Sequence, residues 1–138
     1  MENLNGKIGV VTGAASGIGQ SMAERFCKEG MSVVLADIEE ESLHAAVDDI
    51  VADGGNAVGV VTDGSSKEAI TNLAEETIKH FGAVHVLHNN AGVVAAGLLD
   101  DLTTKDWEWT IGVNLWSVIH GIQTFLPLIK ESGEGHII

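Results

Sequence analysis

Three glycines follow the first apolar run of the chain, in the pattern Gly13-x-x-x-Gly17-x-Gly19. The run KIGVVT before them is typical of a strand that is buried on both faces. After such a strand, Gly13 allows a sharp turn, Gly17 leaves room for a pyrophosphate, and Gly19 lets the following helix pack closely. The backbone N–H groups at the start of that helix then face an anion. The glycines predict a phosphate-binding turn, with a merely tight turn as the alternative.

Asp37 closes the second apolar run, SVVLAD, about 20 residues beyond the glycines, where a carboxylate accepts hydrogen bonds from an adenosine ribose. The alternative is that Asp37 caps the next helix, and one carboxylate can do both. A carboxylate at this point repels a 2′-phosphate, and neither the glycine turn nor the residues just after Asp37 include Arg or Lys. The pattern therefore favours NAD over NADP.

Two further polar groups end the third and fourth apolar runs. Asp63, before Gly64, is placed to reach an adenine amino group or to act as an ordinary cap or turn residue. Residues 89–92 read NNAG, and adjacent buried amides need several hydrogen-bond partners each. They either tie neighbouring strands together beside a ligand or form an Asx turn.

Asn114 lies inside the apolar helical segment IGVNLWSVI. A polar side chain that faces a core is costly unless its hydrogen bonds are satisfied. Either the helix bends there and releases a carbonyl, or Asn114 faces solvent.

Short apolar runs alternate with segments of helical spacing along the whole chain, without an internal linker. This alternation predicts one domain over residues 1–138, a doubly wound parallel sheet in a three-layer α/β/α arrangement. Ser65 with Glu68 fits a capping box at the start of the third helix. The expected strands are residues 7–12, 32–37, 56–63, the run from 84, and 136–138; the last and longest helical pattern spans residues 104–129.

The net charge of −13 makes nucleic acid and anionic membranes poor partners. The six histidines and the single cysteine, Cys27, have no zinc-type spacing, so we expect no metal site. Cys27 cannot form an internal disulfide, and the start MENLNGK does not read as a signal peptide. We expect a cytoplasmic protein.

These motifs together resemble the short-chain dehydrogenase/reductase family. Residues 12–19, TGAASGIG, match its TGxxxGxG cofactor motif, residues 89–92 match its NNAG motif, and Asn114 falls where the family has its catalytic-tetrad asparagine. The resemblance implies a Rossmann fold, a nicotinamide cofactor and hydride transfer between an alcohol and a carbonyl compound. It implies cofactor contacts at Gly13, Ser16, Gly17, Ile18, Gly19, Asp37, Asp63, Gly64, Asn90, Ala91 and Gly92, with Gly64 in place of a more usual apolar residue.

Members of this family continue past the fifth strand to a serine and a Tyr-x-x-x-Lys motif. This chain has no tyrosine and ends at Ile138. We therefore expect the N-terminal, cofactor-binding part of a longer NAD-dependent oxidoreductase, truncated in its fifth strand and inactive alone. The alternative is a non-catalytic dinucleotide-binding module or regulatory partner.

The expected helix 104–129 carries apolar residues at helical spacing on more than one side, which predicts an additional covering surface. In the family this helix commonly packs in subunit interfaces. We expect a homo-oligomer, a tetramer or dimer, that acts on a small alcohol or ketone. The first apolar row consists of Trp107, Ile111, Leu115, Ile119 and Ile122.

Overall fold

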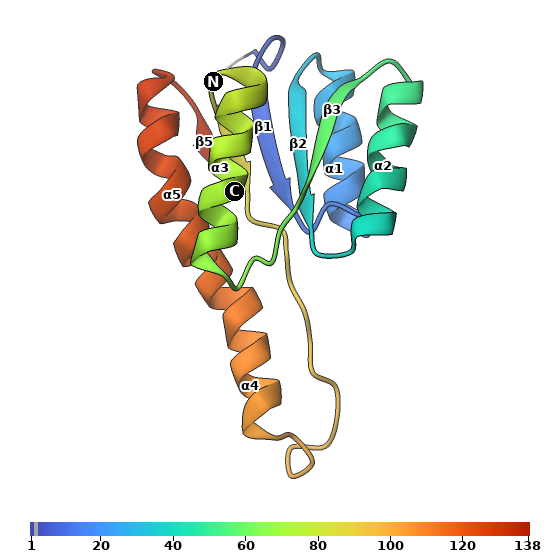
Figure 1. Ribbon diagram of the computed structural model, residues 1–138, viewed down its shortest axis with the longest axis vertical. Helices are drawn as coiled ribbons and strands as arrows, with labels where there is room; N and C mark the ends of the chain where they lie inside the picture. The colour runs from blue at the N-terminus through green and yellow to red at the C-terminus, as the bar shows by residue number, and fades with distance from the viewer. Residues whose placement is uncertain (2) are drawn as a thin grey trace.

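A five-stranded, wholly parallel sheet forms the centre of the computed structural model, which describes residues 1 and 3–138. Its strand order is β3-β2-β1-β4-β5, so the strand order reverses between β1 and β4. The carboxyl ends of the strands meet at one edge, the lower edge in Figure 1. The strands are β1 (Ile8–Thr12), β2 (Ser32–Asp37), β3 (Asn56–Val61), β4 (Val86–His88) and β5 (His136–Ile137).

Helices cover both faces of this sheet, as predicted. One core cluster packs α1 (Gly17–Lys28) and α2 (Glu40–Ala52) against residues such as Val11. The other packs α3 (Lys67–Phe81) and α5 (Ser117–Glu131) against residues such as Val10. Val10 and Val11 point to opposite faces of the sheet and are both fully buried. This explains why the sequence of β1 is a continuous apolar run.

The start of α3 differs from the expected capping box at Ser65 and Glu68. The helix begins at Lys67, and the side chain of Ser66 accepts the capping hydrogen bond at 3.2 Å. The carboxylate of Asp63 accepts hydrogen bonds from both the N–H and the hydroxyl of Ser65, at 2.9 and 2.7 Å. Since a charged acceptor two residues away engages Ser65 first, the cap falls one residue later.

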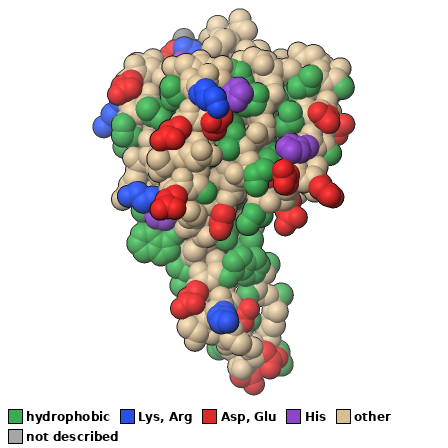
Figure 2. All heavy atoms as spheres, viewed as in Figure 1, with side chains coloured by type: hydrophobic (Ala, Val, Ile, Leu, Met, Phe, Trp, Pro, Cys, Tyr) green, Lys and Arg blue, Asp and Glu red, His purple; other side chains and the backbone are tan. Residues whose placement is uncertain are grey.

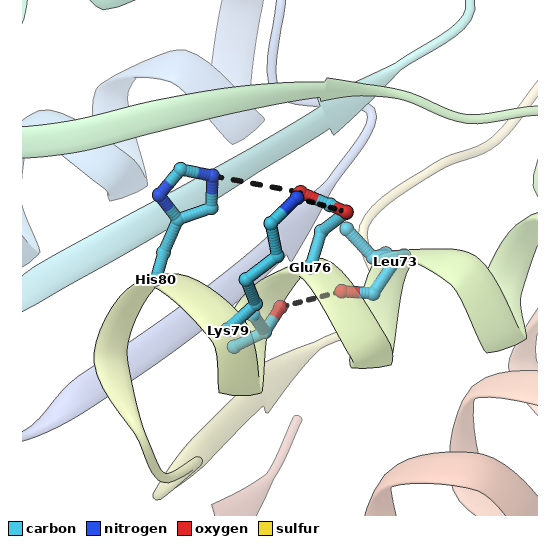
Figure 3. A network of polar contacts seen from close by, with 5 residues as sticks. Leu73, Glu76, Lys79 and His80 are labelled. Carbon is cyan, nitrogen blue, oxygen red and sulfur yellow. Dashed lines mark hydrogen bonds and ion pairs between the residues drawn. The ribbon is translucent and has the colours of Figure 1, made fainter.

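The exposed side of α3 carries a small charged network (Figure 3). The carboxylate of Glu76 accepts two hydrogen bonds from Lys79 Nζ, at 2.8 and 3.0 Å, and lies 3.6 Å from His80 Nε2. The hydrogen bond from Lys79 lowers the pKa of Glu76. On the buried side, the Thr77 hydroxyl donates to the Leu73 carbonyl at 2.7 Å, which satisfies it within its own helix. Neither set of contacts leaves α3.

The predicted long helix is present but has three parts. It begins with α4 (Thr104–Ile111), passes through the π-helical turn η1 (Gly112–Trp116) and continues as α5. A capping box between Thr103 and Asp106 starts it. Neither α4 nor η1 contains a buried residue, and both extend below the sheet with the segment that follows β4 (Figure 1). All three tryptophans of the sequence belong to α4 and η1, at positions 107, 109 and 116.

Hydrophobic side chains gather over this projection on the face shown in Figure 2. About half the surface of Trp107 (49%) and of Leu115 (52%) is exposed. Within the part of the chain that the structure describes, no helix has the length and apolar character needed to cross a membrane.

His88, the last residue of β4, is a buried polar group, 9% exposed. Its ring Nδ1 is buried and has no hydrogen-bond partner among the described residues. Burial lowers the pKa of His88 below the ordinary value of 6.5, so the neutral ring is the stable form in the fold.

We predict that acidification destabilises the fold partly through His88. Its folded pKa is lowered, so below pH 6.5 the unfolded chain binds more protons than the folded chain, and stability falls until the folded pKa is passed. Urea unfolding at about pH 7.5 and about pH 5.5, one unit either side of the ordinary histidine pKa, measures this loss. His88→Val is expected to show a smaller loss than the parent.

The control is His44→Val, which removes an exposed histidine on α2 and should leave the loss unchanged. His85 also has a lowered pKa, from burial and from nearby Lys7, so some pH dependence remains in His88→Val. Equal losses in the parent and in His88→Val would contradict the prediction.

Candidate functional site

The glycine turn after β1 is built by conformation and by close packing. Gly13 has a φ of +64°, a left-handed conformation that favours glycine at a sharp turn. A Cβ at Gly19 would lie 2.6 Å from the side-chain nitrogen of Asn90 and closer still to the carbonyl oxygen of Gly13. Only glycine lets α1 start this close to the strand, as the sequence predicts.

Gly17 differs from these two glycines because its side-chain direction is open. Its φ is +58°, and a Cβ built there meets no atom within 4 Å. Ser16 is the N-cap of α1, yet its side chain makes no capping hydrogen bond. The first N–H of α1 paired to a carbonyl is that of Gln20, to Ser16 at 3.3 Å. The N–H groups of Gly17 and Ile18, two exposed residues, have no hydrogen-bond partner among the described residues, and the first turn contains no acidic residue.

Asp37 supports the glycine turn from the end of β2. Its Oδ2 accepts a hydrogen bond from the Ala15 N–H at 3.0 Å, and its Oδ1 accepts one from the Glu39 N–H at 3.1 Å. The interpretation of Asp37 as a helix cap is wrong, because α2 begins at Glu40 and Glu39 occupies the cap position. Each carboxylate oxygen still has a lone pair for a further donor. One side chain thus shapes the turn and presents negative charge beside it.

Asp63 and Gly64 form the exposed turn after β3. Asp63 is a turn residue whose Oδ1 is engaged by Ser65, and its Oδ2 carries no hydrogen bond from the described residues. A Cβ at Gly64 would point at Ser117 of α5, 3.2 Å from its Cβ. The side-chain direction of residue 64 is thus towards the helix.

The side-chain amide of Asn90 ties the ends of two strands together, in agreement with the strand-linking interpretation of NNAG. The side-chain nitrogen of Asn90 donates to the carbonyl oxygens of Thr12 and Gly13, both at 3.0 Å. The hydroxyl of Thr12 accepts from the backbone N–H groups of Asn90 and Ala91, both at 3.1 Å, and donates to the His88 carbonyl at 3.4 Å. These bonds lock the ends of β1 and β4 where the strand order reverses.

Asn114 is exposed, but both ends of its amide are used. Its Oδ1 accepts from the Val93 N–H and its Nδ2 donates to the Val93 carbonyl, both at 2.7 Å. Asn114 is the middle residue of η1, so the helix departs from α geometry here, while the exposure of Asn114 agrees with the other interpretation, a solvent-facing asparagine. A Cβ at Gly92 would lie 3.6 Å from Asn114 Oδ1. The asparagine therefore connects the helix to the segment after the NNAG residues.

The carboxyl edge of the sheet brings most of the expected residues together. The glycine turn, Asp37 and Asn90 are linked directly by hydrogen bonds, and Asn114 joins them through Val93. Asp63 stands on the neighbouring strand end without a bond to the glycine turn among the described contacts. The arrangement offers phosphate donors beside a carboxylate, which is suited to a nucleotide rather than to a free phosphate. No cluster of three or more metal-ligating side chains occurs in residues 1 and 3–138.

Sequence reasoning gave no separate role to two groups of this site. Thr12 serves as a buried hydrogen-bonding centre, and its signal is a hydroxyl residue at the end of an apolar strand. The backbone of Val93 is the partner of Asn114, and nothing in the sequence marks a main-chain partner 21 residues away.

Comparison with known proteins agrees with this geometry. Residues 7–138 match the profile of the short chain dehydrogenase family. The putative oxidoreductase SadH of Mycobacterium tuberculosis is 36% identical over 138 residues, which are all of this chain and 50% of that protein. The BbsD subunit of (2S)-[(R)-hydroxy(phenyl)methyl]succinyl-CoA dehydrogenase from Thauera aromatica is 36% identical over 98% of this chain and 54% of its own length.

Among solved structures, a short chain dehydrogenase/reductase from Burkholderia phymatum in complex with NAD superposes with a TM-score of 0.96. It is 42% identical, over 99% of this chain and 49% of that one. The apo form of LigD from Sphingobium superposes with a TM-score of 0.94 at 37% identity, over 98% and 58% of the two chains. This chain thus spans about half the length of the curated relatives it matches. The matched profile, the relatives and the superposed folds place this chain in the short-chain dehydrogenase/reductase family.

Proposed function

We propose that this chain is the NAD-binding part of an oxidoreductase that transfers a hydride between a small alcohol or ketone and nicotinamide. The observation that carries the proposal is the pairing of an open, donor-rich turn at Gly17 with the carboxylate of Asp37 beside it. Membership of the family and the NAD complex of its Burkholderia relative support it.

The residues present fit this cofactor. Gly17 leaves its Cβ direction empty and the exposed N–H groups at the start of α1 meet the pyrophosphate, while Ser16 contributes a hydroxyl and Ile18 an exposed apolar side chain. Asp37 has free lone pairs for the ribose, and Asp63 with Gly64 lies where the adenine would end. Asn90, Ala91 and Gly92 line the end of β4 on the way to the nicotinamide. The cofactor supplies or accepts the hydride, whereas these residues bind and orient it.

Proton transfer to the substrate oxygen needs a titrating group, and the sequence contains no tyrosine, the residue that the family uses. Asn114 does not titrate; we assign it a place in the proton relay of the whole enzyme. A second candidate is a dinucleotide-binding module or regulatory partner without catalysis, for which the same turn and carboxylate would serve. In either case we expect a cytoplasmic protein.

We predict that the chain binds NAD more tightly than NADP, because the Asp37 carboxylate repels a 2′-phosphate. Asp37→Ala should weaken NAD by roughly 10- to 100-fold, the value of hydrogen bonds to a charged group. It should weaken NADP less, so the ratio of the two affinities falls. Calorimetric titration with both cofactors measures this ratio.

The ratio matters because Asp37 also holds the Ala15 N–H, so its loss loosens the turn for both cofactors equally. Asp49→Ala, on the exposed side of α2, removes one negative charge elsewhere and should leave the ratio unchanged. NADP binding as tight as NAD binding in the parent would refute the assignment.

Gly17→Ala is expected to lower NAD affinity at least tenfold, because its Cβ enters the space assigned to the pyrophosphate. The substitution also strains a left-handed residue by about 1–2 kcal/mol. Gly54→Ala is a matched control, since Gly54 has a φ of +86°, has nothing within 4 Å of its Cβ direction and lies beyond α2. Thermal unfolding should fall similarly in both variants, but only Gly17→Ala should lose NAD. Equal NAD affinities would mean that the glycine turn is only a turn.

We also propose that the protein forms a dimer or tetramer through α4, η1 and α5. Leu115→Asp should shift sedimentation towards the monomer, because it places a charge in the exposed apolar row (Figure 2). Val51→Asp is the control, as Val51 on α2 is equally exposed, 51% against 52%. A parent that sediments as a monomer across the micromolar range would contradict this prediction.

A further inference from the structure

The turn after β3 packs against the π-helical turn through alternating glycines and serines. A Cβ at Gly64 would lie 3.2 Å from the Cβ of Ser117, and a Cβ at Gly112 would lie 3.4 Å from the Cβ of Ser65. Each serine thus faces a residue without a side chain on the other element. A contact this close leaves no room for an added methyl group at Gly64 unless a neighbour moves.

Ser117 also supports the backbone next to Asn114. It is 5% exposed, and its hydroxyl donates to the carbonyl of Val113. The bond runs from a serine hydroxyl to the carbonyl four residues earlier, so it links the start of α5 to the π-helical turn. The residue after Val113 is Asn114, whose amide holds Val93.

We propose that Gly64 and Ser117 form a size-matched pair that positions Asn114 against Val93. They are positioning residues: Gly64 leaves the space that Ser117 fills, and Ser117 fixes the turn that presents the asparagine. The proposal deepens the proposed function, from which Asn114 takes its role, but the contact itself is measured without cofactor.

The turn after β3 is the firmer side of this contact. The Thr62 N–H donates to the Asp37 carbonyl at 2.8 Å, and the Ser66 N–H donates to the Asp63 carbonyl at 3.0 Å. The side chain of Ser66 then caps α3. The π-helical turn, by contrast, contains no buried residue. Volume added at residue 64 therefore presses on Ser117, the first residue of α5, which directly follows η1.

Residue 64 has to be small for Ser117 to fit against it. Gly64→Val adds a branched apolar side chain at this position. Here that substitution should disturb Asn114, because its side chain points at Ser117. Removing the Ser117 side chain in the same molecule should relieve the disturbance.

The test is hydrogen exchange of the Val93 amide, whose N–H donates to Asn114 Oδ1 at 2.7 Å. In Gly64→Val, exchange of this amide is expected to be about tenfold faster or more, in line with the cost of overpacking. The amide of Val34 in β2 should keep its parent rate, which shows that the fold is intact. A general loss of stability would accelerate both amides.

The double variant Gly64→Val with Ser117→Gly is expected to exchange at Val93 more slowly than Gly64→Val alone. Ser117→Gly by itself loses the hydroxyl bond to Val113, so the two substitutions should be strongly non-additive. If Gly64→Val does not fold, Gly64→Ala gives the same comparison with a smaller side chain. Parent-like exchange at Val93 in the Gly64 variant, or a double variant no better than the single one, would overturn the proposal. Neither result depends on whether the chain binds NAD.

Discussion

The hydrogen bonds between Thr12 and the residues after β4 are the contact on which the candidate site depends. These bonds lie at the point where the strand order reverses, the place at which open parallel sheets generally bind their ligands. The Thr12 hydroxyl and the Asn90 amide hold the two strand ends at a fixed separation with five hydrogen bonds. Gly19, which has no Cβ, approaches both the Gly13 carbonyl and the Asn90 amide that belong to this network. The ends of β1 and β4 are therefore held together by contacts within the chain itself.

The elements of the fold were predictable because their signals are local. The continuous apolar runs of β1 and β2 require burial on both faces, and Gly30, with a φ of +85°, follows the end of α1 as expected. The predicted cap of α3 was wrong because sequence spacing alone cannot distinguish Ser65 from Ser66. In the fold, the Ser65 hydroxyl donates to Asp63, and the side chain of Ser66 caps the helix instead. The partners of Asp37 and Asn114 are backbone groups 22 and 21 residues away, so only the folded chain identifies them.

Asp37 stands beside the anion site that we propose for this acidic protein. The net charge of −13 is spread over the surface, whereas the donors at the start of α1 act at short range. The carboxylate of Asp37 accepts a hydrogen bond from the Ala15 N–H, so the turn itself fixes where this negative charge stands. The Asp37 side chain consequently sets both the conformation of the glycine turn and the charge beside it. A mutation that alters one of them alters the other.

The tryptophans confine the intrinsic fluorescence of the molecule to one region. Because the sequence has no tyrosine and its tryptophans lie only in α4 and η1, the intrinsic fluorescence of the chain comes from the projection below the sheet. The sheet and its covering helices dominate the far-ultraviolet circular dichroism but emit nothing. Denaturation followed by both signals therefore compares two regions of one chain, and non-coincident transitions would identify the projection as a separately melting unit.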